Sequence, residues 1–176
     1  MQYRTIPHST LPDVAYSEHI VVRRPSEFDI PGLTDLFLEM QSHYGRPVSD
    51  RIAYAAATLA CQPLVNAFAP RVLIAVADET FAGSLVMNVT FPAFELTRSL
   101  FIRDLYVTQS ARRCGVARTL MKAAARLAID EGFSALEWTT DSANTAARKM
   151  YEACGAKQLG RTYYRLFDDD LIDAAE

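Results

Sequence analysis

Two adjacent arginines, Arg112 and Arg113, lie between a strand-like segment and a helix-like segment, in the pattern Arg112-x-x-Gly115-x-Ala117. The first N–H groups of a helix lack intrahelical partners and carry partial positive charge, so they attract anions. Gly115 allows close approach of the backbone, and Ala117 keeps the first turn clear of a bulky side chain. Guanidinium groups can bind phosphate with two hydrogen bonds. The spacing therefore predicts a binding site for a diphosphate.

Two other phosphate-binding patterns are absent from the sequence. There is no G-x-x-x-x-G-K-[ST] segment and no G-x-G-x-x-G after a strand, which excludes a P-loop nucleotidase and a dinucleotide fold by pattern. Taken alone, however, the arginine and glycine positions are equally consistent with an exposed turn. These positions alone therefore do not identify a diphosphate site.

A second pattern in the chain supports the interpretation as a diphosphate site. Asn144, Ala147, Tyr151 and Gly155 fall at offsets of 0, 3, 7 and 11, so the first three share one face of an expected helix. By itself, Tyr151 on an apolar stripe is typical of a core tyrosine whose hydroxyl is satisfied. Its place in this pattern favours a functional role.

Together with Val107, the two patterns resemble those of the GNAT superfamily of acyl-CoA-dependent N-acetyltransferases. The resemblance covers roughly residues 19–168, and within the family the segment "IRDLYV" is most similar to the spermidine/spermine acetyltransferase branch. It implies acetyl-CoA as co-substrate, bound in a V between two parallel strands at 100–107 and 135–140. The implied cofactor-binding residues are Leu105, Tyr106, Val107, Arg112, Arg113, Cys114, Gly115, Val116, Ala117, Arg118, Asn144 and Ala147.

The resemblance also implies a direct attack of an amine on the thioester. The Val107 N–H would stabilise the oxyanion, and the Tyr151 hydroxyl would protonate the departing thiolate. Arg103 stands where the diamine branch commonly has a catalytic glutamate. This cation would repel a dication and favour an acceptor with a carboxylate. Asp104 is the candidate base, although an ordinary structural ion pair explains it equally well, and Tyr44 is a candidate acceptor contact.

The element pattern predicts a mixed α+β fold of the GNAT type. We expect a mostly antiparallel mixed sheet of six to seven strands, with about four helices packed on both faces. Residues 1–18 would form an N-terminal extension, 19–170 a single acetyltransferase domain and 171–176 a C-terminal tail. Expected strands lie at 19–24, 71–78, 82–91, 99–108 and 134–140, with a final pair in "AKQLG" and "TYYRLF"; expected helices begin near Ser26 and cover 49–62, 115–132 and 142–155. A short turn around Asp78–Thr80 is expected to join the strands 71–78 and 82–91 in a hairpin. The helix 115–132 has a predicted apolar stripe of Val116, Leu120, Ala124, Leu127 and Ala128, and Gly132 is expected to follow its end.

Composition narrows the class of protein further. The chain has 176 residues, a net charge of −3 and 22% charged residues. This charge balance lacks the excess of basic residues that is typical of nucleic-acid-binding proteins. Three cysteines and three histidines without ligand spacing predict no metal and reduced thiols in a cytoplasmic protein. No apolar run suggests a membrane partner. By analogy with the family we expect a homodimer that acetylates a small primary amine; the alternatives are a protein or peptide N-acetyltransferase and a non-catalytic acyl-CoA sensor.

Overall fold

The computed structural model describes residues 14–17, 20–93 and 96–176. These residues fall into two compact units, Met1–Asp141 and Ser142–Glu176, which are described separately. Most of the expected N-terminal extension, 1–18, lies outside the described residues. The domain boundaries at 19 and 170 stay a prediction.

The first unit is built on a six-stranded sheet in which the strands follow one another in chain order. Neighbouring strands are antiparallel, except that the last two are parallel. The strands are β1 (Val14–Ser17), β2 (Ile20–Arg23), β3 (Arg71–Ala77), β4 (Thr80–Thr90), β5 (Ser99–Val107) and β6 (Leu136–Trp138). Five of these strands match expected strands, while β1 is an addition.

The predicted hairpin joins β3 to β4 through a two-residue loop. Asp78 and Glu79 have φ values of 47° and 62°. Two consecutive positive φ values match the type I′ turn, whose twist suits a tight hairpin. The hairpin sets β3 beside β4, and β2 pairs with the other edge of β3. β3 therefore lies inside the sheet, and most of its residues are buried.

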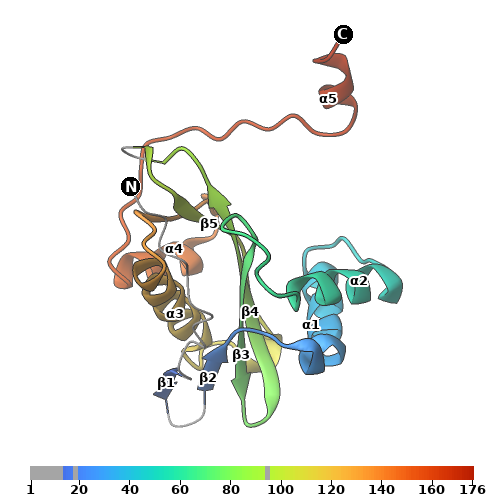
Figure 1. The fold of residues 1–176 in the computed structure, drawn as a ribbon, viewed down its shortest axis with the longest axis vertical. Helices are drawn as coiled ribbons and strands as arrows, with labels where there is room; N and C mark the ends of the chain where they lie inside the picture. Colours follow the sequence, from blue (N-terminus) through green and yellow to red (C-terminus); the bar gives the residue numbers. More distant parts are fainter. Residues whose placement is uncertain (1–13, 18–19, 94–95) are drawn as a thin grey trace. The chain divides into compact units, whose positions relative to one another are not determined.

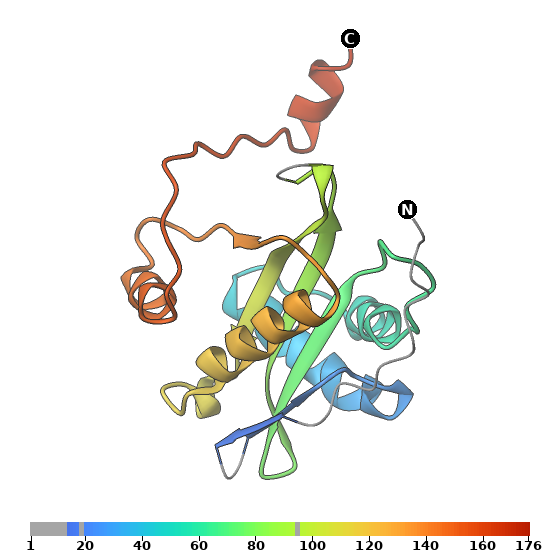
Figure 2. The same cartoon turned by 60° about the vertical axis from the view of Figure 1, so that its left-hand side comes forward.

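Helices cover both faces of the sheet (Figures 1 and 2). α1 (Ile30–His43) and α2 (Asp50–Ala60) lie on one face, and α3 (Val116–Asp130) lies on the other. The α1 side of the core is a cluster of buried side chains comprising Leu33, Leu36, Phe37, Met40, Ala53, Ala57, Ile74 and Tyr106. No helix in the described parts of the chain is both long and apolar enough to cross a membrane.

The apolar stripe predicted for α3 is confirmed. Val116, Leu120, Ala124, Leu127 and Ala128 are all buried, and this face packs against the sheet. Gly132 ends the helix with a φ of +72°, as expected for the residue after a C-cap.

The second unit contains α4 (Thr145–Ala153) and the short helix α5 (Asp169–Asp173). The expected final pair of strands is wrong: residues 156–168 form no strand in the described structure. The apolar residues of this segment are present but exposed, namely Leu159, Tyr163, Tyr164, Leu166 and Phe167. A strand requires a partner for its backbone groups as well as strand-forming side chains, and this segment pairs with no described strand.

Candidate active site

The pairing between the parallel strands β5 and β6 ends partway along β5. β6 pairs with Leu100, Phe101 and Ile102 alone, and no described strand pairs with that edge of β5 beyond Ile102. At the same point the register with β4 shifts: Val86 lies opposite Asp104, whereas Met87 lies opposite Ile102. Arg103 is therefore the extra residue of a β-bulge. The pairing of the two strands thus ends at the bulge, as expected for the V between parallel strands that the resemblance implies.

The free edge of β5 carries backbone groups that have no strand partner. The N–H of Thr108 donates to the Ala82 carbonyl on β4 at 3.0 Å. Because successive residues of a strand direct their backbone groups to opposite edges, the N–H and C=O of Val107 face away from β4. Leu105, two residues earlier, has the same orientation. This edge can accept an extended polyamide as an additional strand.

The predicted diphosphate loop leads from β5 into α3 through a strained turn. Arg113 and Gly115 adopt left-handed conformations, with φ values of 66° and 87°. The α3 ladder begins with the bond from the Thr119 N–H to the Gly115 carbonyl at 3.0 Å. The N–H groups of Val116, Ala117 and Arg118 precede that bond and are directed out of the helix end. A left-handed residue in such a loop helps to form a concave group of amides that binds anions.

The side chains of this loop differ in what they can contribute. Arg113, Cys114 and Arg118 are exposed, while Ala117 is half-buried. The Val116 side chain is buried in the core, so only its N–H can face a ligand. An added Cβ at Gly115 would meet no atom within 4 Å, so the space beside it is open.

Arg112 is exposed, but its guanidinium makes contacts with neighbouring elements. Its Nε donates to the Val107 carbonyl at 3.3 Å, and its Nη2 lies 3.2 Å from Nε2 of His43. The guanidinium carbon lies 6.0 Å from the centre of the Tyr106 ring. Arg112 thus covers the edge of β5 that was predicted to bind the coenzyme, and a ligand there must displace it.

Glu39 on α1 connects that helix to the end of β5. Its Oε1 accepts from the Tyr106 hydroxyl at 2.8 Å and from the Gln109 N–H at 3.0 Å. Burial, together with the neighbouring Glu39 carboxylate, raises the pKa of Tyr106 to about 12. This phenol is therefore a hydrogen-bond donor and not an acid at neutral pH.

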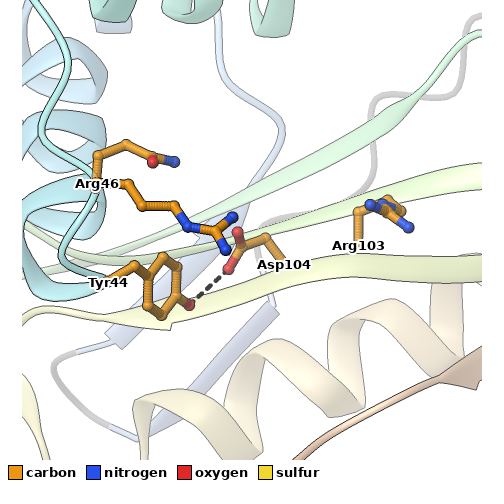
Figure 3. Close-up of a pocket in the computed structure, with 5 residues that line it drawn as sticks. Tyr44, Arg46, Arg103 and Asp104 are labelled. Carbon is orange, nitrogen blue, oxygen red and sulfur yellow. Dashed lines mark hydrogen bonds between the residues drawn. The ribbon is translucent and has the colours of Figure 1, made fainter. Parts of the chain in front are cut away.

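A polar cavity of about 470 Å³ lies at the C-terminal end of α1 (Figure 3). It is lined by Gln41, Tyr44, Arg46, Arg103 and Asp104. The Tyr44 hydroxyl donates to Oδ1 of Asp104 at 2.9 Å. Burial raises the pKa of the Asp104 carboxyl, and the bonds from Tyr44 and the Leu105 N–H oppose that rise without cancelling it.

The bulge explains why two neighbouring residues line one cavity. In a regular strand Arg103 and Asp104 would point to opposite faces of the sheet. A bulge changes the direction of a side chain locally, and both residues line the polar cavity. The structure therefore brings together three residues that the sequence nominated: Tyr44, Arg103 and Asp104.

A larger, mainly apolar cavity of about 820 Å³ adjoins the polar one and shares Gln41, Arg103 and Asp104 with it. Its walls come from α1, α2, strands β3 to β5 and the segment 62–70 that connects α2 to β3. Its apolar lining residues include Phe37, Met40, Val48, Ile52, Ala53, Ala56, Leu59, Ala60, Leu64, Val65, Phe68, Val72 and Val86.

Three nominated residues belong to the second unit. The Asn144 side chain caps α4 by accepting from the Ala147 N–H at 3.1 Å. This local role leaves the Asn144 amide NH₂ as its remaining donor group. Ala147 and Tyr151 lie on one half-buried face of α4, as their spacing predicted. Their roles with the coenzyme stay predictions.

Sequence reasoning missed much of the cavity lining. Arg46 and the segment 62–70 match no motif, and only the fold brings them to Asp104 or to α1. The one available signal was the apolar composition of "PLVNAFAP", which is unusual for an exposed connection.

Two curated proteins are similar in sequence to part of this chain. The chain is 29% identical over 80 residues to L-ornithine N5-acetyltransferase NATA1 of Arabidopsis thaliana, and 38% identical over 68 residues to thialysine N-epsilon-acetyltransferase of Caenorhabditis elegans. The first match covers 46% of this chain and 35% of the relative, and the second covers 38% of this chain and 42% of the relative. The chain therefore spans less than half the length of each of these relatives.

Solved structures share the fold over most of the chain. An integron cassette protein from the mobile metagenome of V. cholerae superposes with a TM-score of 0.76 at 28% identity, covering 91% of this chain and 99% of that one. A probable acetyltransferase gives a TM-score of 0.71 at 23% identity, with coverages of 84% and 95%.

The profile of the acetyltransferase (GNAT) family matches residues 33–156, which is well over half of the chain. The matched range contains most of α1, the bulged strand β5, the arginine and glycine loop and α4. The chain belongs to the acetyltransferase (GNAT) family of acyltransferases.

Proposed function

We propose that the protein is an acetyl-CoA-dependent N-acetyltransferase that acetylates the primary amine of a small molecule. The observation that carries the proposal is the free edge of β5, which opens after the bulge at Arg103 and leads into the loop before α3. Both relatives described above are named as acetyltransferases of small amines. That likeness supports a small-molecule acceptor over a protein or peptide.

The residues around this edge fit the coenzyme. The backbone of Leu105 to Val107 would pair with the pantetheine amides, and the N–H groups of residues 116–118 would bind the diphosphate. Arg113 and Arg118 are exposed beside that loop and would add charge. Arg112 would leave the Val107 carbonyl and join them. The bound coenzyme supplies an acetyl group activated as a thioester.

Asp104 is our candidate for the base. An alkyl ammonium has a pKa of about 10.4, so at neutral pH a proton must be removed before its nitrogen can attack. A raised pKa makes the Asp104 carboxylate a stronger base than an exposed aspartate. The Tyr44 hydroxyl, 2.9 Å from Oδ1, would hold the carboxylate in position. The proton would pass to Asp104 directly or through one water.

Two further groups would complete the transfer. The Val107 N–H would donate to the oxygen of the attacked carbonyl as negative charge develops there. When the carbon–sulfur bond breaks, Tyr151 would give its hydroxyl proton to the thiolate. The Tyr151 role rests on the Asn144 pattern of the family, since α4 belongs to the second unit.

The test measures acetyl-CoA binding and thiol release separately. Arg113→Ala and Arg118→Ala should each weaken acetyl-CoA binding severalfold, because each removes a positive charge from the proposed diphosphate-binding site. Arg126→Ala is the matched control: Arg126 lies on the same helix but pairs with Asp130. Equal affinities for all three variants would contradict the loop assignment.

Turnover then distinguishes the remaining alternatives. Thiol release would be followed over a panel of amines, amino acids and peptides. Binding of acetyl-CoA without release for any acceptor would favour the non-catalytic sensor. Tyr151→Phe should lower release and change its pH profile, and an unchanged profile would contradict the assignment of the acid.

Residues 156–172 expose a series of large apolar side chains within the second unit. Such an exposed apolar segment is typical of a protein interface. We propose that a second copy of the chain covers it in a homodimer, which sedimentation of the protein would test. The three free cysteines are consistent with the cytoplasm, which we propose as its location.

A further inference from the structure

We propose that the acceptor is a hydrophobic amino acid: a primary amine that carries a carboxylate and a bulky apolar side chain. The proposal rests on the proposed function, and it names the substrate class of that same site. It differs from the diamino acids named for the two curated relatives.

The apolar cavity can hold the side chain of such an acceptor. Its volume of about 820 Å³ lies within the range of about 300–1,000 Å³ that is typical of small-molecule sites. Phe37 and Met40 line its buried side, and the exposed Ile52, Leu59 and Phe68 line its rim. Burying an apolar group there would also remove these exposed side chains from water.

Charged side chains lie at one end of the apolar cavity. Among the described residues, Arg103 and Asp104 are the only charged groups that line the apolar cavity, and both lie where it meets the polar cavity. Arg46 lines the polar cavity too, and in Figure 3 its side chain extends toward Asp104. This junction therefore has two cations and one carboxylate.

These charges match the head group of an amino acid. The amine would face the Asp104 carboxylate, and the acceptor carboxylate would bind Arg46 and Arg103. The side chain would then extend into the apolar cavity. A diamine would fit poorly, because its second ammonium would lie in the apolar cavity without a carboxylate, and burying an unpaired charge is unfavourable.

Two matched pairs of acceptors test the two halves of the proposal. L-Phenylalanine and phenethylamine differ only in the carboxylate, and L-norleucine and L-lysine differ only in the second ammonium. We expect kcat/KM for acetyl transfer to be at least about tenfold higher for phenylalanine than for phenethylamine. We expect a similar preference for norleucine over lysine.

Variants connect these preferences to residues. Arg46→Gln and Arg103→Gln should each reduce the phenylalanine-to-phenethylamine ratio severalfold, since each removes one partner of the carboxylate. Ala56→Trp should fill part of the apolar cavity and lower kcat/KM for phenylalanine about tenfold. Ala55→Trp is the matched control, because Ala55 is an exposed neighbour on α2 that does not line the cavity.

The outcomes separate this inference from the proposed function. Faster acetylation of lysine than of norleucine, or a substrate ratio that ignores both arginines, would overturn the inference while leaving the acetyltransferase function intact. If acetyl-CoA neither binds nor reacts, the proposed function fails. Calorimetric binding of phenylalanine that Ala56→Trp abolishes would then still support the assignment of the cavity, and absence of that binding would overturn it.

Discussion

Replacing Asp29 with asparagine should destabilise the protein at neutral pH and lose that effect in acid. Asp29 lies at the start of α1, the helix that carries Glu39 and Tyr44 into the candidate site. Its carboxylate accepts two bonds from the Arg23 guanidinium, both at 2.7 Å, and one from the Ser26 N–H at 2.7 Å. These contacts fix the beginning of α1 to the end of β2.

The size of the effect follows from the Asp29 pKa. The hydrogen bonds from Arg23, the largest cause, and those from Ser26 lower this pKa from 3.8 to about 2, although burial acts in the opposite direction. A lowering of 1.8 (3.8 minus 2) corresponds to roughly 2.4 kcal/mol at about 1.36 kcal/mol per pH unit. The Arg23 side chain is 35% exposed, so solvent screening reduces the expected contribution to about 2 kcal/mol.

The sign of the pH dependence is fixed by the direction of the pKa change. Because the folded state holds the carboxylate in its charged form, the stabilisation is complete above the unfolded pKa of about 4. It is lost as the pH falls from about 4 to about 2. The difference in unfolding free energy between wild type and Asp29→Asn should therefore shrink toward zero over that window.

Urea unfolding of both proteins at pH 7 and pH 2 measures this difference. Subtracting the two proteins at each pH cancels the other titrating groups that they share. Asp35→Asn is the control, because Asp35 lies exposed on the same helix. A loss of equal size at both pH values, or a loss below about 0.5 kcal/mol at pH 7, would refute the electrostatic account of this contact.

Three further predictions concern the site itself. Burial raises the Asp104 pKa, so the charged carboxylate lowers the stability of the protein at neutral pH. Asp104→Asn should therefore raise Tm at pH 7, and this gain should shrink in acid. The same variant should lower thiol release about 100-fold. Gly83→Ala would place a Cβ 2.5 Å from the Tyr106 carbonyl oxygen, so it should destabilise the protein by about 1–3 kcal/mol and weaken acetyl-CoA binding, whereas Gly160→Ala, with no atom within 4 Å of its Cβ, should do neither. Glu39→Gln should bring the Tyr106 pKa below its value of about 12, which absorbance titration against a Tyr106→Phe reference would detect.

The elements that the sequence predicted well are those defined by local signals. The α3 stripe, its terminating Gly132 and the turn at Asp78 and Glu79 each depend on residues close together in the chain. The final strand pair failed for the opposite reason. Its alternating apolar residues satisfy a local pattern, but strand formation also needs a partner that the pattern does not specify.

The candidate site divides along the same line. The loop from Arg112 to Ala117 could be nominated from the sequence because its pattern lies within six residues, and its role with the coenzyme stays a prediction. The contact of Arg112 with His43 and the Val107 carbonyl was not, since it joins the ends of different elements. Nor could a sequence pattern place Arg46 beside Asp104, because that proximity depends on how α1 ends against β5.

The bulge in β5 links the two halves of the site physically. The pairing of β5 with β6 ends at Ile102, immediately before the bulged residue Arg103, and the edge at Leu105 and Val107 has no described strand beside it for the proposed coenzyme to displace. The same bulge places the Arg103 side chain at the polar cavity beside Asp104, where it contributes to the charge that the proposed acceptor would meet. The side chain at the bulge can therefore change acceptor preference without altering the backbone that would bind the coenzyme. Arg103→Glu should accordingly shift preference from norleucine toward lysine while the affinity for acetyl-CoA stays within about twofold, and a parallel loss of both would show that the bulge itself depends on Arg103.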